Sequence, residues 1–194
     1  MQEPARTATT PPSALSKTRR CVAFTGKEDY IYKQGDTVSH AYHGIGTIKS
    51  VGEKEVLGTK LKLTTLYFPH EGLRLSVRRD DLEDQVREIL TEEEAHEIID
   101  YLAGFDEKLA KNWKKRNANN KERLTSGNPR EVCQVAKGLM RLKKQRKKPL
   151  SNSDRRQLQK AFRLLAEELG RVLDEEAEVM EDKLREACRD SLAA

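Results

Sequence analysis

The stretch LRLSVR at residues 73–78 alternates strictly between apolar and polar side chains, which is typical of a strand with one buried face. A period of two places Leu73, Leu75 and Val77 on the inner face and turns the residues between them outward. After Val86 the apolar residues recur every three or four positions instead, as in helices with one buried stripe. This change of period predicts an α+β chain, with a β-rich segment followed by a helical one.

Turn residues divide the β-rich segment into short strands. The stretch KQGD at 33–36 predicts a turn, and Gly44 and Gly46 permit a bulge or a tight bend in the strand that contains them. Gly58 marks a hairpin loop. Four or five short strands within about 50 residues are typical of a small curled barrel.

Helix start signals punctuate the second segment. Thr91 and Glu94 form a capping box, in which each side chain bonds the backbone amide of the other. A second helix is expected from about Glu107 to Leu124, ending near Gly127. The pair at 128–129, Asn then Pro, opens a third helix.

Two more helices complete the expected bundle, one capped by Ser151 or Ser153 and one that follows Gly170. The apolar stripes expected to form its core are Ala95, Ile98, Ile99 and Leu102; Val132, Val135, Ala136, Leu139 and Leu142; Leu158, Phe162, Leu165 and Leu169; and Ala177, Met180 and Leu184 with Ala187 or Cys188. The fold predicted from the sequence is therefore a small β-barrel followed by a compact all-α helical bundle.

The charge of the chain is concentrated in one segment. Between Lys108 and Arg163 there are nineteen Lys and Arg residues against three acids, although the whole chain has a net charge of only +5. The segments on both sides, 83–107 and 164–194, are acidic. A solvated helical surface is the ordinary explanation of a charge run, but this excess exceeds ordinary surface mixing. It favours contact with a phosphate backbone, which releases counterions when Lys and Arg bind it.

The single tryptophan, Trp113, lies inside this basic segment. A lone tryptophan is usually a core residue, and Leu109 four positions earlier would share its helical face. The later positions on that face are the polar Arg116, Asn117 and Asn120. The apolar stripe thus stops at the tryptophan, which predicts an at least partly exposed ring that could stack on a base or enter a groove.

Other classes of protein have little support in the sequence. It contains no nucleophile elbow and no phosphate-cradling glycine loop, so we expect no enzyme and no cofactor. The histidines and cysteines lack metal-ligand spacing, so we expect no metal site. The residues Cys21, Cys133 and Cys188 are interpreted as free thiols in a reducing cytosol. No apolar run approaches membrane-spanning length, and the N-terminus does not resemble a secretory signal.

Five motifs together resemble the bacterial CarD/CdnL transcription regulators. They are KQGDTV at 33–38, HGIG at 43–46, NWKKR at 112–116, LTSGN at 124–128 and AFRLLAEEL at 161–169. The resemblance implies a Tudor-like module, here residues 31–88, that docks on the β subunit of RNA polymerase. It also implies a helical module, here 89–194, that contacts promoter DNA near the upstream edge of the melted bubble. Residues 1–30 have a composition typical of a disordered tail.

The resemblance also implies roles for single residues. Trp113 matches a tryptophan that wedges into the minor groove, and Lys115 and Arg116 match supporting basic positions. Lys54 and Ser76 match positions that face polymerase. With the outward and basic residues read from the sequence, the candidate polymerase-binding residues are Lys54, Arg74, Ser76 and Arg78. The candidate DNA-binding residues are Trp113, Lys114, Lys115, Arg116, Lys143, Lys144, Arg146, Lys147 and Lys148.

Together with the basic segment and Trp113, the resemblance implies a monomeric, cytoplasmic, nucleoid-associated regulator. Such a regulator would bind the RNA polymerase β subunit and promoter DNA and stabilise the open complex. Two other hypotheses remain open at this stage. One is a nucleoid or architectural protein that binds duplex DNA without polymerase. The other is a protein-interaction adaptor whose basic bundle meets an acidic partner.

Overall fold

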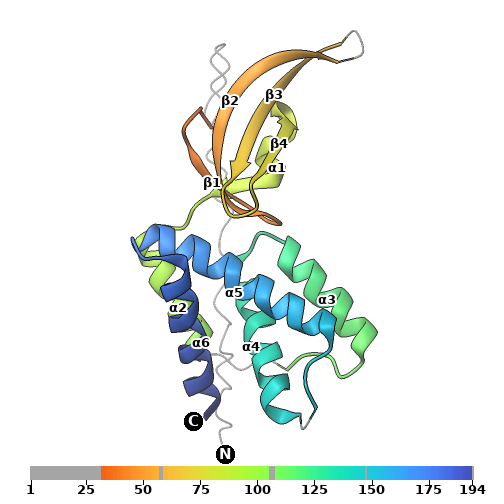
Figure 1. Ribbon diagram of the computed structural model, residues 1–194, viewed down its shortest axis with the longest axis vertical. Coiled ribbons are helices and arrows are strands. Elements are labelled where there is room, and N and C mark those ends of the chain that lie inside the picture. Colours follow the sequence, from red (N-terminus) through yellow and green to blue (C-terminus); the bar gives the residue numbers. More distant parts are fainter. Residues whose placement is uncertain (1–31, 57–58, 105–107, 147, 194) are drawn as a thin grey trace, which may run out of the picture. The chain divides into compact units, whose positions relative to one another are not determined.

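The computed structural model describes residues 32–56, 59–104, 108–146 and 148–193 (Figure 1). The predicted tail at 1–30, the hairpin loop at Gly58 and the basic residue Lys147 lie outside the described residues.

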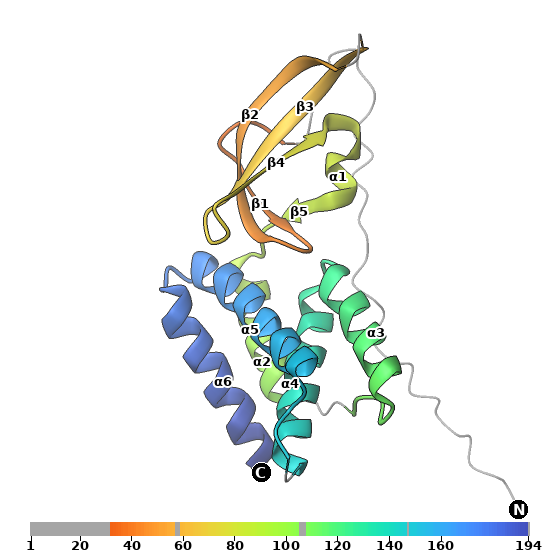
Figure 2. The same cartoon turned by 45° about the vertical axis from the view of Figure 1, so that its right-hand side comes forward.

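Five strands form one antiparallel sheet in the order β4-β3-β2-β1-β5 (Figures 1 and 2). Their bounds are Thr37–His40 for β1, Gly44–Val56 for β2, Thr59–Phe68 for β3, Leu73–Arg78 for β4 and Val86–Glu88 for β5. A 3-10 turn, η1 (Arg79–Asp81), and a short helix, α1 (Leu82–Gln85), connect β4 to β5. The sequence analysis did not predict α1.

The closed barrel expected from the sequence is not confirmed. The described pairings leave β4 and β5 as the two edges of the sheet, because neither is paired with the other. A shift of register lies between Ile48 and Ser50 in β2, beyond the glycines where a bulge was expected. Alternation within one strand predicts which face is buried, but strand closure depends on pairing between residues far apart in sequence.

The sheet buries one face over a small core. Val77 is buried and Leu73 and Leu75 pack against the core from the same face of β4, which confirms the inward residues predicted from the alternation. The buried members of this core are Val38, Ile48, Leu66, Phe68, Val77, Leu82 and Val86.

Two glycines of β2 are required by close approach. A Cβ atom on Gly46 would lie 2.6 Å from the ring of Phe68. Gly44 has a φ of +78°, and a Cβ atom there would lie 2.5 Å from the carboxylate of Glu167. Gly44 therefore both begins the strand in a left-handed conformation and lets the sheet approach a helix.

Five helices follow the sheet. Their bounds are Glu92–Gly104 for α2, Trp113–Thr125 for α3, Pro129–Gln145 for α4, Asn152–Val172 for α5 and Ala177–Ala193 for α6. All four apolar stripes predicted from the sequence contribute to one core, centred on buried residues such as Leu102, Leu139, Phe162 and Leu184. The helical part of the α+β prediction is confirmed.

The predicted caps are confirmed at three helix starts. Thr91 Oγ1 accepts from Glu94 N at 3.2 Å, and Glu94 Oε2 accepts from Thr91 N at 2.9 Å, which completes the capping box. The Asn128 side chain accepts from Arg130 N at the start of α4. Of the two serines considered for α5, Ser151 is the cap, and its Oγ accepts from Asp154 N.

Sheet and helices contact each other and form one compact unit from Tyr32 to Ala194. Strand β5 reaches the bundle through Arg87, whose guanidinium binds Glu168 of α5. The division into independent segments at 31–88 and 89–194 stays a prediction.

Candidate functional site

The first turn of α3 presents the tryptophan. The Asn112 side chain caps the helix by accepting from Lys115 N at 3.2 Å, so Trp113 is the first helical residue. Its side chain is 48% exposed, which makes it one of the few large apolar residues left at the surface of the described chain. The predicted partial exposure of this ring is confirmed. Lys114 and Lys115 are exposed in the same turn.

The helix starts later than the sequence predicted. The segment just before Asn112 is not helical, so Leu109 does not share a helix face with Trp113. Its side chain packs instead against Gly138 of α4, where a Cβ atom would lie 2.5 Å from Leu109 Cγ. The cap at Asn112 fixes the start, because its side chain satisfies an amide that would otherwise lack a partner.

Arg116, in the same turn, is buried rather than presented to solvent. Its Nε and Nη2 atoms donate to the two carboxylate oxygens of Asp154 in α5, at 3.2 and 3.0 Å. Nη1 donates to the carbonyls of Ala110 and Lys111 at 3.1 and 3.3 Å. The exposed fraction of the Arg116 side chain is 1% and that of Asp154 is 0%. The sequence-based role of Arg116 as a phosphate contact is therefore corrected, because its donors are already used inside the protein.

Hydrogen bonds and nearby positive charges favour the charged form of the Asp154 carboxyl despite its burial. Burial alone would raise the pKa of Asp154, but the hydrogen bonds from Arg116 and Ser151 and the charges of Arg116 and Arg146 outweigh it. The net effect is a lowered pKa. Arg116 thus acts as a fixed anchor for the turn that carries Trp113.

The middle of the inner face of α3 is also polar, whereas Leu124 near the end of the helix is apolar and buried. Asn120 is fully buried and donates to Gln157 Oε1 at 3.0 Å. Asn117 Oδ1 accepts from Ser153 Oγ at 2.6 Å and from Gln157 Nε2 at 2.8 Å. The sequence pattern did not reveal these buried residues, because they are polar and an apolar stripe marks only apolar ones.

Four of the remaining predicted DNA-binding residues lie around the end of α4. Lys143 and Lys144 are exposed in its last turn, and Arg146 and Lys148 are exposed just beyond it. Lys144 Nζ also donates to the carbonyl of Leu192 at 2.6 Å, so this amine is partly engaged by α6.

Two hollows with basic linings meet at Arg146. One, of about 420 Å³, is bordered by Lys108 and Lys111 as well as by the side of α4. The other, of about 400 Å³, is bordered by Lys143, Arg146 and Lys148, together with Arg155. The candidate DNA-binding residues named from the sequence did not include Lys108, Lys111 or Arg155, although all three belong to the basic segment. Together these residues form a basic surface that adjoins the first turn of α3 through Lys111.

The four predicted polymerase-binding residues share one face of the sheet. Arg74, Ser76 and Arg78 pair with Tyr67, Thr65 and Leu63 of β3, and Lys54 pairs with Leu61. Cross-strand partners lie on the same face, so all four belong to the face opposite the core.

This outer face combines cations with partly exposed apolar side chains. Arg74 lies over the Tyr67 ring at 5.9 Å from its centroid, and Lys49 lies over the same ring at 5.6 Å. Leu61 and Leu63 are only partly buried. Strand β4 is an edge of the sheet, so its outer backbone is available to a partner as well.

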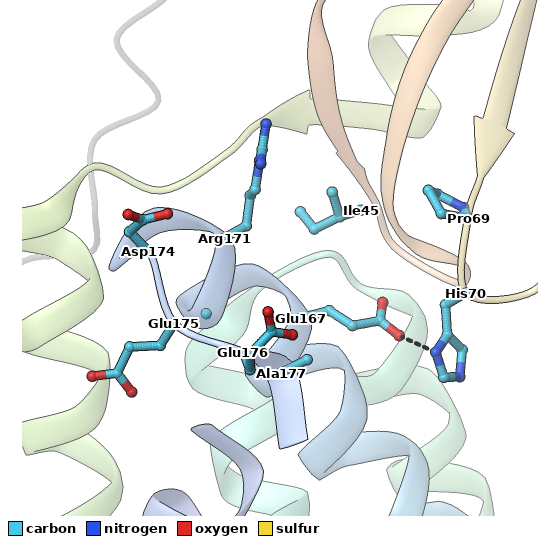
Figure 3. A pocket seen from close by; sticks show the side chains of 10 residues that line it. Ile45, Pro69, His70, Glu167, Arg171, Asp174, Glu175, Glu176 and Ala177 are labelled. Carbon is cyan, nitrogen blue, oxygen red and sulfur yellow. Dashed lines mark ion pairs between the residues drawn. The ribbon is translucent and has the colours of Figure 1, made fainter. Parts of the chain in front are cut away.

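A third hollow, of about 400 Å³, lies where the sheet meets the turn between α5 and α6 (Figure 3). His70, in the turn between β3 and β4, pairs there with Glu167 of α5 at 3.4 Å. Burial raises the pKa of Glu167 against the opposing effects of His70 and Arg163. The carboxylates of Asp174 and Glu176 also line it. The carboxylates that line this hollow repel phosphate, so its charge is opposite to that of the basic surface around Arg146.

The thiol prediction is confirmed for two of the three cysteines. Cys133 and Cys188 are free and buried, and Cys21 lies outside the described residues. Burial raises the pKa of Cys133 to about 12 and that of Cys188 to about 11. Such thiols are structural and poorly reactive.

Comparison with known proteins relates the helical part of the chain to a known family. Residues 97–185, from within α2 to within α6, match the family described as CarD, C-terminal domain. Over 143 residues, covering 72% of this chain and 90% of the relative, the chain is 26% identical to the Bacillus subtilis (strain 168) protein named "Putative transcription factor YdeB". The helical part of the chain is therefore similar to CarD proteins, and both matches support a transcription regulator. Within the described part of the chain, no helix is long and apolar enough to cross a membrane.

Proposed function

We propose that this protein docks on the β subunit of bacterial RNA polymerase and stabilises the open promoter complex. The first turn of α3 contacts DNA at the upstream edge of the bubble, and the outer face of the sheet contacts polymerase. In this proposal the protein is a cytoplasmic, nucleoid-associated monomer without enzymatic activity.

The exposed ring of Trp113 carries the proposal. Burying a tryptophan stabilises a fold, yet this ring remains 48% exposed on a turn that Arg116 holds firmly from beneath. An exposed aromatic between cations suits an unstacked base step, against which a flat ring can pack. The rigid anchor keeps the ring available at low cost in side-chain and backbone entropy.

The ring favours the open state only if it binds melted DNA better than closed duplex. Ligands shift an equilibrium by their differential affinity alone, and a wedge meets that condition because an unstacked step exists in one state and must be created in the other. The basic surface around Arg146 adds contacts to phosphates that are similar in both states and sensitive to salt.

Docking on polymerase compensates for the weakness of such contacts. A small basic surface binds duplex DNA loosely at physiological salt, whereas tethering raises the local concentration of the wedge at promoters. The outer sheet face supports this role because it offers Leu61, Leu63 and Tyr67 within a rim of cations. Apolar area with surrounding charge is a usual composition for a protein interface.

The first experiment measures the lifetime of the open complex with Trp113→Ala. Loss of one stacking contact is worth about 1–3 kcal/mol, so we expect the lifetime extension to fall roughly five- to hundredfold. Val179→Ala is the matched control, because Val179 is a similarly exposed apolar residue, at 50%, on α6. Full activity of Trp113→Ala would refute the wedge.

The second experiment measures affinity for the isolated β subunit. Arg74→Glu and Arg78→Glu should weaken docking and leave duplex DNA binding unchanged. Lys60→Glu reverses a charge on the same hairpin, but Lys60 pairs with Glu55 and belongs to the opposite face, so it should have little effect. Normal docking of both Arg74→Glu and Arg78→Glu would place the polymerase interface elsewhere. If the unmodified chain itself does not bind the β subunit while DNA binding persists, polymerase-independent architectural binding becomes the better assignment.

A further inference from the structure

Glu168 of α5 joins the sheet to the bundle. Its side chain is almost fully buried, and its Oε1 and Oε2 atoms accept from Nη1 and Nη2 of Arg87 in β5, at 2.5 and 2.7 Å. It also accepts from the backbone amide of Leu90 at 3.2 Å and from Ser39 Oγ of β1 at 3.3 Å. One carboxylate therefore binds two strands and the segment that leads from the sheet into α2.

A second buried carboxylate lies near the other end of the same helix. Asp154 precedes Glu168 by fourteen positions in α5, which corresponds to about 21 Å along the axis at the usual helical rise. Asp154 holds Arg116 and so fixes the first turn of α3. The helix between the two carboxylates contains no proline and has no break.

The far end of α3 is bound to the same junction. Arg87 Nε donates to the carbonyl of Gly127, at 2.7 Å, in the turn after α3 ends at Thr125. Helix α3 is therefore tied at its start through Asp154 and just beyond its end through Arg87. The sheet, α5 and the segment from α3 to the turn that follows it therefore form a closed loop of contacts.

We propose that α5 is a strut that holds the docking face of the sheet at a fixed spacing from Trp113, with Arg87 and Glu168 as positioning residues. This inference rests on the proposed function, since it concerns how two contacts act together. A rigid spacing lets both contacts form at once without further loss of entropy, whereas a loose joint lowers the effective concentration of the wedge at the bubble.

The strut predicts a separation of effects. Arg87→Ala and Glu168→Gln should leave affinity for the β subunit and for duplex DNA within about twofold of the unmodified chain, and yet shorten the open-complex lifetime about tenfold or more. Arg87→Lys keeps the charge but cannot form the fork to Glu168, so its lifetime should lie between those of Arg87→Ala and the unmodified chain.

Nitrogen-15 relaxation of the full chain measures directly whether the sheet and the helices move as one body. The sheet and the helices should tumble with one correlation time in the unmodified protein and with two shorter ones in Arg87→Ala. Arg130→Ala is the matched control, because Arg130 of α4 pairs at 3.2 Å with Glu97 of α2, another helix of the bundle, and not with the sheet. It should leave both tumbling and lifetime unchanged.

Three results would overturn the strut. Common tumbling in Arg87→Ala would show that the junction does not fix the spacing. Independent tumbling with an unchanged lifetime would show that fixed spacing is not needed. A parallel loss of both separate affinities would show that Arg87 acts through folding alone. If the unmodified chain itself fails to extend the lifetime, the proposed function fails, while the relaxation result still accepts or rejects the strut.

Discussion

Strand β4 and the first turn of α3 were both predicted to present polar residues outward, but the structure confirms only one of these predictions in full. In β4, Arg74, Ser76 and Arg78 all lie on the outer face. In α3, Lys115 is exposed and its neighbour Arg116 is buried. The apolar residues of β4 define which side is inside, whereas the start of α3 has no apolar stripe and its inner side is set by a carboxylate on another helix.

The largest expected effect on stability separates the buried Arg116 from the exposed Arg78. Arg116→Ala leaves the carboxylate of Asp154 buried without its partner, which should lower the free energy of unfolding by about 3–5 kcal/mol. Arg78→Ala removes an exposed side chain and should change it by less than about 0.5 kcal/mol. Denaturant unfolding of both variants measures the contrast. Similar losses for the two arginines would contradict the buried-anchor interpretation.

The same contrast should depend on pH. The lowered pKa of Asp154 gives stability that is present above its unfolded pKa and is lost as pH falls through the folded value. In Arg116→Ala, burial remains without the offsetting guanidinium, so the carboxyl protonates more readily. The gap in unfolding free energy between Arg116→Ala and the unmodified chain should therefore narrow from pH 7 towards pH 3. Denaturant unfolding of both proteins across this pH range measures the difference. A difference that does not change with pH would contradict the stabilisation of the Asp154 carboxylate by Arg116.

A smaller effect is expected from the cap. Asn112→Ala removes the acceptor for Lys115 N and should cost about 1 kcal/mol. Asn119→Ala, at an exposed position inside α3, should cost nothing and could even stabilise the helix. Thermal melting of the two variants compares them. Equal melting temperatures would mean that the helix start does not depend on Asn112.

The smallest effect on stability, and a clear one on binding, is expected for Lys115. Lys115→Ala should leave the unfolding free energy within about 0.5 kcal/mol and reduce the salt dependence of duplex binding by about one unit of slope. Lys183→Ala removes an exposed lysine of α6 that binds Glu175 and should leave that slope unchanged. Identical slopes in both variants would remove Lys115 from the DNA interface.

Features could be predicted from the sequence when the residues that form them lie close together along the chain. The capping box of Thr91 and Glu94 and the cap at Asn128 were confirmed because their partners lie two or three residues away. The exposure of Trp113 was predicted from polar positions on its own helix. The burial of Arg116 depends on Asp154, thirty-eight residues further along the chain, and no local pattern marks that pairing.

The sequence by itself determined the α+β class, the inner face of β4, the apolar stripes of the bundle and the basic segment that contains the tryptophan. These follow from periodicity, capping chemistry and charge, each of which acts over a few neighbouring residues. The tertiary structure alone decided that the sheet stays open in its described pairings, that Arg116 anchors and does not contact phosphate, and that Glu168 ties the sheet to α5. Those features come from desolvated charges and strand edges that find partners only when distant segments pack together.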